Sequence, residues 1–431
     1  MTTLNNLSLT ELAELRTRGE FDAAALLESC VDRIVSREDD VQAFEYIDID
    51  KLRATPLEAT TSLLGTGLEG IPFGVKDLMD TCDMPTGWGS PIYTGRQAGR
   101  DAGCVAMLRA CGAQVVGKTV TTEFACFFPG KTRNPRNPAH TPGGSSQGSA
   151  AAVADCMVPF ALGTQTAASI IRPAAYCGVI GYKTSRGAFD LGGICSLSQT
   201  LDSLGFFVRD ARDLGIIRSA LMRGQHVGKS AQPARVGLVR TPHWEEASVV
   251  AREAVEGAAE KLSRAGVIIE ELEVGPDDGA LTDSHKVVMA YEAARARIFE
   301  YKNYPEQLSQ QMISLIETGL ALTATEYNNA IALAREWMLW LDDVLVGVDC
   351  LISPSTPGEA PAGLDSTGDP VFSRMWTLLG QPSINLPVGE GPNGMPIGIQ
   401  LIGRNNHDDT LISHAAWMQP LIGCVVSLDR S

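Results

Sequence analysis

The sequence lacks the close cysteine and histidine spacings that mark metal sites and disulfide frameworks. Its ten cysteines are scattered along 431 residues, with no C-x-x-C pair and no histidine at ligand spacing. Most of them lie in apolar stretches, which is typical of reduced thiols inside a core. We therefore expect no metal centre and a reducing compartment.

Long apolar runs and clusters of basic residues are also missing. No apolar run reaches the length of a membrane-spanning helix. The N-terminus has no basic region followed by an apolar one, as a secretory signal would have. The formal net charge is −16, which argues against nucleic acid and anionic membranes as partners, since both bind clustered Lys and Arg. We expect a soluble, cytoplasmic protein.

The first part of the chain carries helix signals. Ser8 and Glu11 have the spacing of a capping box, and leucines at helical spacing follow them. A second helix is expected from Asp22 to about Arg37, and residues 50–66 read as a variable connector. We divide the chain into a helical N-terminal region, residues 1–65, and one compact domain, residues 66–431.

From Gly70 onward, short apolar runs alternate with helical patterns, which indicates an α/β sheet with helices on its faces. Residues 240–345 are richer in helix signals, with a long amphipathic helix that ends at Gly266 and two more helices over 285–303 and 324–343. The segments CLISPS, SINLPV and PIGIQLIG then return to strand. This late return predicts one sheet that distant segments complete.

Two short motifs match known signatures in the wrong context. Residues 112–119 fit the phosphate-binding pattern G-x-x-x-x-G-K-[ST], but they follow a helical pattern and contain the strand-forming run AQVV. A phosphate-binding loop would instead follow a strand and open a helix. We interpret Gly112 as a helix end that leads into a strand.

Residues 144–148 fit G-x-S-x-G, the nucleophile elbow of α/β-hydrolases, with Ser146 at its centre. That elbow needs a strand directly before it, whereas the preceding segment TRNPRNPAHTPG holds three prolines and cannot form a central strand. None of the histidines has a convincing triad context. They are His140, His226, His243, His285, His407 and His414.

Residues 143–173 read GGSSQGSAAAVADCMVPFALGTQTAASIIRP and hold two small-residue turns, each with a serine. The serines are Ser145 and Ser169, and Lys76 ends the upstream apolar run IPFGVK. Two serines and a lysine in an apolar setting are sufficient for acyl transfer without histidine. In the second turn, small residues let backbone N–H groups converge as an oxyanion hole. We assign these groups to Thr166, Ala167, Ala168 and Ser169.

This stretch resembles the signature of the amidase signature family of serine hydrolases, and the resemblance extends from about Gly65 to Leu421. Further blocks that carry it are RACGAQVVGKTVTTEFA, TLDSLGFFVRD and GQPSINLPVGEGPNGMPIGIQLIG. By alignment with the family's motifs, Ser169 is the nucleophile, Ser145 the bridging serine after a cis peptide, and Lys76 the base. The resemblance implies a single α/β/α sandwich with a large mixed β-sheet, a homodimer, and no cofactor.

Within the family, the compact length and the segment STGDPVFSRMWTLLGQP are most similar to malonamidase-type enzymes, which cleave small carboxylate-bearing amides. Two positions depart from the general pattern. The Gly-Gly before the nucleophile is Ala167-Ala168, which narrows the oxyanion pocket, and the usual aspartate is Gln165, which we place at the substrate.

Two further sites are candidate substrate contacts. Arg172, three residues after the nucleophile, either clamps a substrate carboxylate or forms a structural ion pair. Cys126 and Phe127 align near the family's substrate-side loop and suggest an apolar wall. Lys76 must be neutral to act as a base, and burial favours this, while Asp77 is expected to point elsewhere.

We therefore expect a hydrolase that cleaves the C–N bond of small amides through an acyl-enzyme on Ser169, with a small molecule as its substrate. A carbamate, urea-like or ester hydrolase with the same triad is one alternative. Another is a weakly active or partner-dependent subunit of amidotransferase type, since some members of the family pass ammonia to a second protein.

Overall fold

The structure is a computed structural model that describes residues 3–54, 66–222, 230–273 and 279–423. Its centre is an eleven-stranded sheet in the order β1-β3-β2-β4-β6-β5-β10-β11-β9-β7-β8. The strands are β1 (Phe44–Ile47), β2 (Pro72–Lys76), β3 (Gln114–Thr119), β4 (Phe160–Gln165), β5 (Ile180–Lys183), β6 (Ser203–Val208), β7 (Arg235–Arg240), β8 (Ile268–Glu273), β9 (Cys350–Pro354), β10 (Ser383–Glu390) and β11 (Pro396–Ile402).

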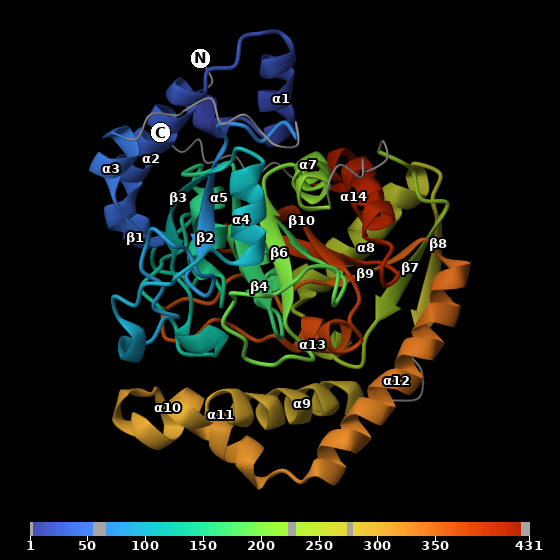
Figure 1. Cartoon of the computed structure of the whole chain (residues 1–431). Coiled ribbons are helices and arrows are strands. Elements are labelled where there is room, and N and C mark those ends of the chain that lie inside the picture. Colours follow the sequence, from blue (N-terminus) through green and yellow to red (C-terminus); the bar gives the residue numbers. More distant parts are fainter. Residues whose placement is uncertain (1–2, 55–65, 223–229, 274–278, 424–431) are drawn as a thin grey trace.

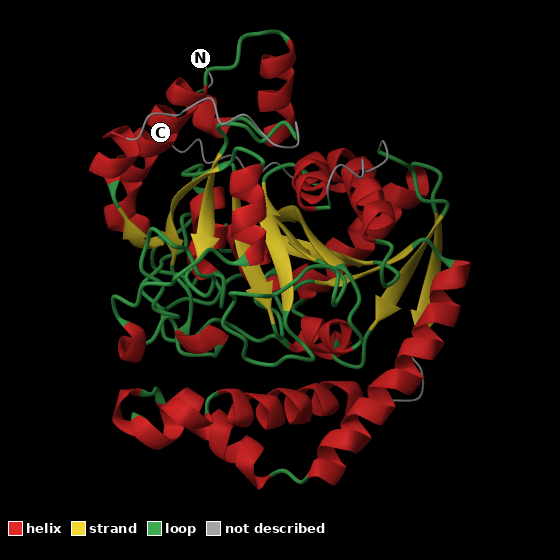
Figure 2. Ribbon diagram, in the orientation of Figure 1, coloured by secondary structure: helices red, strands yellow, loops and turns green. Residues whose placement is uncertain are grey.

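Helices cover both faces of this sheet (Figure 2). The α-helices of the described residues are α1 (Leu9–Thr17), α2 (Ala23–Val41), α3 (Ile49–Ala54), α4 (Gly103–Ala110), α5 (Gln147–Ala154), α6 (Ile171–Cys177), α7 (Ala211–Leu221), α8 (Val249–Arg264), α9 (Ala280–Ala296), α10 (Ile298–Asn303), α11 (Gln310–Ala321), α12 (Ala324–Gly347), α13 (Val371–Leu378) and α14 (Asp408–Ile422).

Successive side chains of a central strand serve two different cores, as strand geometry requires. Phe206 and Val208 of β6 pack in one core with α4, α7, α8 and α14, while Phe207 between them packs in a second core with α5 and α6. The sheet is mixed: β2 runs parallel to both β3 and β4, and β4 runs antiparallel to β6. The predicted α/β/α sandwich is confirmed.

The late strands complete the same sheet, as the sequence predicted. β9 pairs with β7 in parallel and with β11 antiparallel, and β10 joins β11 to β5. Residues 114–119 form β3, which confirms that this segment is a strand and not a phosphate-binding loop. Within the described residues 66–222, no strand directly precedes Gly144, so the nucleophile-elbow pattern also lacks its required context.

The N-terminal region follows its sequence signals with three differences. The capping box of Ser8 and Glu11 begins α1, and α2 extends beyond Arg37 to Val41. Residues 44–47 form the edge strand β1, which the sequence analysis did not predict. Part of the predicted connector belongs to α3, and its remainder, 55–65, lies outside the described residues. The division of the chain at residue 65 stays a prediction.

Helices α9 to α12 form a layer beside the sandwich, which we call the helical arm (Figure 1). The helix predicted over 324–343 is present as α12, and the stretch predicted over 285–303 is divided at Arg297 into α9 and α10. Helix α11 was not predicted. Apolar residues of α9 and α12 share a core with α13 and with the ends of β9 and β11. The arm therefore packs against the edge of the sandwich where α13 lies.

Nine of the ten cysteines fall in the described residues, and all nine are free thiols, most of them buried. Cys424 lies outside the described residues. In the described part of the chain, no helix combines the length and the apolar character needed to cross a bilayer.

Close packing of α5 on β3 gives the first prediction. A Cβ added at Gly148 would lie 2.1 Å from the carbonyl oxygen of Ala43 and 2.4 Å from the backbone nitrogen of Val120. Gly148→Ala should therefore destabilise the fold by about 1–3 kcal/mol, because α5 must move off the sheet. Urea unfolding measures the change.

Gly257→Ala, in α8, is the matched control, because a Cβ there meets no atom within 4 Å. Alanine is the better helix former, so this variant should gain ~0.5–1 kcal/mol. Equal stability of the two variants would contradict the packing argument.

Candidate active site

Lys76 is the last residue of β2 and is fully buried. Its Nζ donates to Oγ of Ser145 at 2.7 Å and to Oγ1 of Thr164 at 3.0 Å. Burial lowers the pKa of Lys76 well below its usual value, and the charge of Asp202 opposes this shift without cancelling it. An amine with a lowered pKa and a hydroxyl partner is suited to accept a proton.

Asp77, next in sequence, takes a different partner. Its carboxylate lies 3.1 Å from Nζ of Lys118 and accepts from the backbone N–H of Gly87 at 2.9 Å. The two consecutive side chains thus serve separate sites, as the sequence analysis expected. The carboxylate of Asp77 therefore does not pair with the Lys76 amine and does not stabilise its charged form.

Ser145 lies in the turn before α5, and the peptide bond between Gly144 and Ser145 is cis. The backbone N–H of Thr122 donates to the Ser145 carbonyl at 3.3 Å. The next residue, Ser146, uses its hydroxyl for the Thr164 carbonyl at 3.2 Å. Ser146 therefore binds the turn to β4, while the Ser145 hydroxyl faces the lysine.

Ser169 lies in the loop between β4 and α6. Its carbonyl accepts from the backbone N–H of Ser146 at 3.3 Å, so the two serine turns are hydrogen-bonded neighbours. The structure thus brings together Lys76, the Ser145 turn and the Ser169 turn, although they come from three separate parts of the sequence. All three residues are buried.

The carbonyls of the loop before Ser169 each have a donor. The Thr166 carbonyl accepts from Nε2 of His285 at 2.8 Å and the Ala167 carbonyl from Oγ1 of Thr377 at 2.8 Å. In a trans peptide the following N–H points the opposite way from the carbonyl. The N–H groups of Ala167, Ala168 and Ser169 have no acceptor among the described residues, as an oxyanion hole requires.

Gln165 is almost fully buried, and its side-chain amide is engaged within the protein. Its oxygen accepts from the backbone N–H groups of Ile170 and Ile171 at 2.9 and 3.1 Å, and its nitrogen donates to Oγ1 of Thr377 at 3.0 Å. In this geometry Gln165 spans the Ser169 loop and holds its shape. A direct substrate contact of Gln165 stays a prediction.

The sequence analysis recognised the block around Asp202 but assigned it no role. Its carboxylate accepts from Oγ1 of Thr166 at 2.6 Å and from Oγ of Ser196 at 2.7 Å. Burial raises the pKa of Asp202, and these hydrogen bonds oppose the shift. Asp202 therefore fixes the first residue of the candidate oxyanion loop.

Arg172, in α6, holds two loops by their backbones. Its guanidinium donates to the carbonyl of Gly144 at 2.8 Å and to the carbonyl of Gly368. Burial lowers its pKa to about 10. Among the described residues no carboxylate lies within ion-pair distance, so the structural ion pair considered from the sequence is not formed there. The carboxylate clamp stays a prediction.

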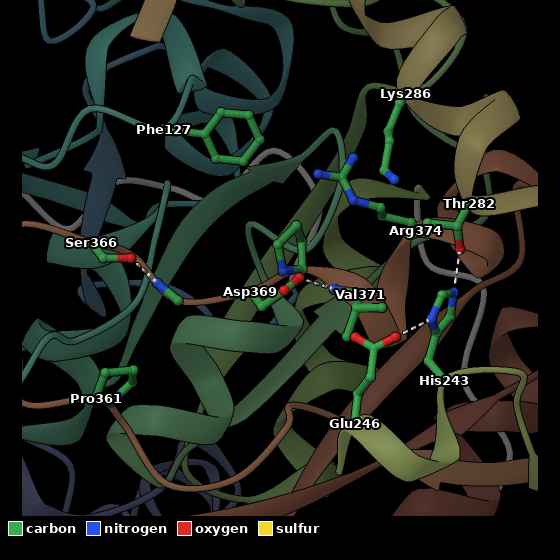
Figure 3. A pocket seen from close by; sticks show the side chains of 12 residues that line it. Phe127, His243, Glu246, Thr282, Lys286, Pro361, Ser366, Asp369, Val371 and Arg374 are labelled. Carbon is green, nitrogen blue, oxygen red and sulfur yellow. Dashed lines mark hydrogen bonds and ion pairs between the residues drawn. The ribbon is translucent and has the colours of Figure 1, made fainter. Parts of the chain in front are cut away.

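A cavity of about 640 Å³ opens between α13 and α9 (Figure 3). Phe127 lines it, whereas Cys126 is buried and is not among the described lining residues. A substrate contact of either residue stays a prediction. Arg374 in α13 also lines the cavity, and its Nη1 lies 2.9 Å from Nδ1 of the buried His285. Neither residue was a candidate from the sequence, because only the three-dimensional fold brings them together.

Comparisons with known proteins show the family and the fold of the chain. The family model described as Amidase matches residues 25–412. A glutamyl-tRNA(Gln) amidotransferase subunit of Lachnospira eligens is 28% identical, covering 93% of this chain and 95% of the relative. A solved amidase is 29% identical with a TM-score of 0.86, covering 97% of this chain and all of that one. The peptide amidase of Stenotrophomonas maltophilia is 26% identical with a TM-score of 0.80, covering 97% of each.

The contacts of Arg172 give the second prediction. Arg172→Met leaves two carbonyls without their donor, which should lower the free energy of unfolding by about 1–3 kcal/mol. Because the Gly144 carbonyl precedes Ser145, turnover should fall alike for neutral and carboxylate-bearing substrates. Urea unfolding and a kinetic comparison of both substrate classes measure this, with the exposed Arg295→Met as control. A defect confined to carboxylate-bearing substrates would favour the clamp instead.

Proposed function

Because the chain belongs to the amidase family, we propose that it hydrolyses the C–N bond of small amides through an acyl-enzyme on Ser169. One observation carries the proposal: the buried amine of Lys76 lies 2.7 Å from Oγ of Ser145. The turn that holds Ser145 is in turn hydrogen-bonded to the loop of Ser169. These groups supply a nucleophile, a relay and a base without a cofactor.

In the proposed reaction, Oγ of Ser169 attacks the amide carbonyl while its proton passes to Ser145, whose own proton passes to neutral Lys76. Backbone N–H groups of the loop from Thr166 to Ser169 stabilise the oxyanion. The proton then returns through Ser145 to the departing nitrogen, which leaves as ammonia or an amine. Water hydrolyses the acyl-enzyme by the same relay, and this step frees the carboxylic acid and restores Ser169.

The third prediction concerns the nucleophile. Ser169→Ala should lower kcat by about 1000-fold or more, because no other group forms the acyl-enzyme. The fold should remain, since the hydroxyl makes no hydrogen bond among the described residues. A fluorophosphonate probe followed by peptide mapping should label Ser169 in the unmodified chain. Labelling of Ser146 instead would overturn the assignment.

The fourth prediction concerns the base. Lys76→Met should lower kcat by about 100- to 10,000-fold, the usual contribution of a general base. In the unmodified protein, kcat/KM should rise with pH as the amine loses its proton. Because the pKa of Lys76 lies well below its usual value, the plateau should begin below pH 10.5. A profile that disappears when His285 is replaced, while Lys76→Met stays active, would contradict the lysine assignment.

A second candidate function has one observation in its favour. The relatives found among curated proteins include amidotransferase subunits at 28% identity over nearly the whole chain. The purified chain alone should release ammonia from an amide if it is a free-standing hydrolase. Activity only after a partner is added would favour the amidotransferase alternative.

A panel of amides, carbamates and esters shows which type of bond the enzyme prefers. The homodimer and the cytoplasmic location stay predictions.

A further inference from the structure

Two carbonyl groups of the loop before Ser169 are held by side chains from other elements. His285 of α9 donates from Nε2 to the carbonyl of Thr166 at 2.8 Å. Thr377 of α13 donates from Oγ1 to the carbonyl of Ala167 at 2.8 Å. Both side chains are buried, and α9 packs against α13 (Figure 1). The candidate oxyanion loop is therefore held by two helices, one of them in the helical arm.

Each of these carbonyls shares a peptide group with an N–H of the candidate oxyanion hole. The Thr166 carbonyl and the Ala167 N–H belong to one trans peptide, and the Ala167 carbonyl and the Ala168 N–H belong to the next. Because a trans peptide is planar, a partner that fixes its carbonyl also fixes the direction of its N–H. The same hydrogen bond polarises the peptide and makes the N–H a stronger donor.

The loop does not hold its own shape by backbone hydrogen bonds. The N–H groups of Ala167 and Ala168 have no acceptor among the described residues. Internal hydrogen bonds of that kind are what normally fix a buried turn. An oxyanion hole works only when its donors are already in place, since reorienting them during the reaction would consume the stabilisation that they give. The two outside donors supply this constraint.

The proton that His285 donates is fixed by Arg374. Nη1 of Arg374 lies 2.9 Å from Nδ1 of His285. Arginine donates hydrogen bonds and never accepts them, so Nδ1 is the acceptor and the ring proton is on Nε2. Burial, together with the charge of Arg374, lowers the pKa of His285 to about 3, so the ring is neutral near neutral pH. Its single N–H is thus directed at the Thr166 carbonyl.

The proton of Thr377 is fixed in the same way by Gln165. Nε2 of Gln165 donates to Oγ1 of Thr377 at 3.0 Å, so the hydroxyl directs its own proton at the Ala167 carbonyl. Each donor to the loop is therefore oriented by a further side chain. This is the support that a site of fixed geometry requires.

We propose that His285 and Thr377 are positioning residues of the oxyanion hole, with His285 oriented by Arg374. They touch no substrate and act by holding the N–H groups of Ala167 and Ala168 toward the oxygen of the reacting acyl group. The inference rests on the proposed function and goes beyond it, because it makes the helical arm part of the machinery of acyl transfer. Since the oxyanion exists only in the reaction itself, these residues affect kcat more than KM.

The rate at which a fluorophosphonate labels Ser169 tests the proposal without a known substrate. Oγ of Ser169 forms a bond to phosphorus as fluoride leaves, its proton passes to the Ser145 relay, and the phosphonyl oxygen takes the place of the oxyanion. His285→Leu and Thr377→Val keep apolar bulk and lose the donor. Each should slow labelling by about tenfold or more, less than the ~100- to 1000-fold that follows complete loss of an oxyanion donor.

Conservative variants and a stability control separate positioning from folding. His285→Gln and Thr377→Ser keep a donor for the carbonyl and should recover most of the labelling rate. Leu262→Ala removes a buried side chain from α8, which packs on β8 to β11 and α14. It should lower stability and leave the labelling rate of the folded protein unchanged. Because neutral His285 takes no proton in the reaction, His285→Gln should also keep the pH dependence of labelling that Lys76 sets.

The outcomes distinguish this proposal from the proposed function. Labelling of His285→Leu and Thr377→Val at the rate of the unmodified chain overturns the positioning role and leaves the proposed function standing. Equal slowing in Leu262→Ala, or loss of the pH dependence in His285→Gln, overturns it as well. If one donor variant does not fold, the other gives the same test. An unmodified chain that is not labelled at Ser169 overturns the proposed function, and the positioning role with it.

Discussion

The burial of the Lys76 amine is the constraint on which the rest of the site depends. A charged ammonium in the middle of a sheet is costly, so the protein must either pair it or favour its neutral form. Here its partners are the hydroxyls of Ser145 and Thr164, which stabilise either form without adding a negative charge. The carboxylate whose charge opposes the shift, Asp202, is engaged with Thr166 and Ser196. The low pKa of Lys76 follows directly from this arrangement.

Two other buried lysines show how specific that arrangement is. Lys118, on the adjacent strand β3, pairs with Asp77 at 3.1 Å and forms an ordinary buried ion pair. Lys183, in β5, donates to the carbonyl of Thr184, and burial lowers its pKa to about 7. Only Lys76 of these three faces a serine hydroxyl. Depth in the sheet is therefore common to all three, and Lys118 also donates to a hydroxyl, Oγ1 of Thr86, at 2.6 Å. The proposed base differs from Lys118 in that its hydroxyl partner is a serine and that no carboxylate of the described residues pairs with it.

Local sequence patterns were sufficient for much of the fold, whereas the roles of Lys76, Ser145 and Ser169 came from the resemblance to the amidase signature family. The apolar runs of β2, β3 and β4 are short and bounded by turn residues, and small residues mark both serine turns. The strand β1 was missed because only its pairing with β3 makes residues 44–47 a strand. Helix α11 was missed although Met312, Ile316 and Gly319 lie on one buried face, a signal that was available. Arg374 and His285 were missed for a different reason, since a single arginine or histidine in a helix carries no local signal. His285 meets Thr166 across 119 positions of the chain and Arg374 across 89, and contacts at such separations depend on how the helical arm packs against the sandwich.

The position of the arm has a consequence for specificity. Lys76, Ser145 and Ser169 lie at strand ends and turns of the sandwich, whereas His285, Thr282 and Lys286 come from α9 of the arm. The arm also contacts the loop after β3, because the residue before α11, Ser309, donates its backbone N–H to Glu123 at 3.0 Å. The residues of the proposed triad and part of the cavity lining thus belong to different layers of the fold. Changes in the arm can alter what the cavity accepts while the buried lysine and its hydroxyl partners stay in place.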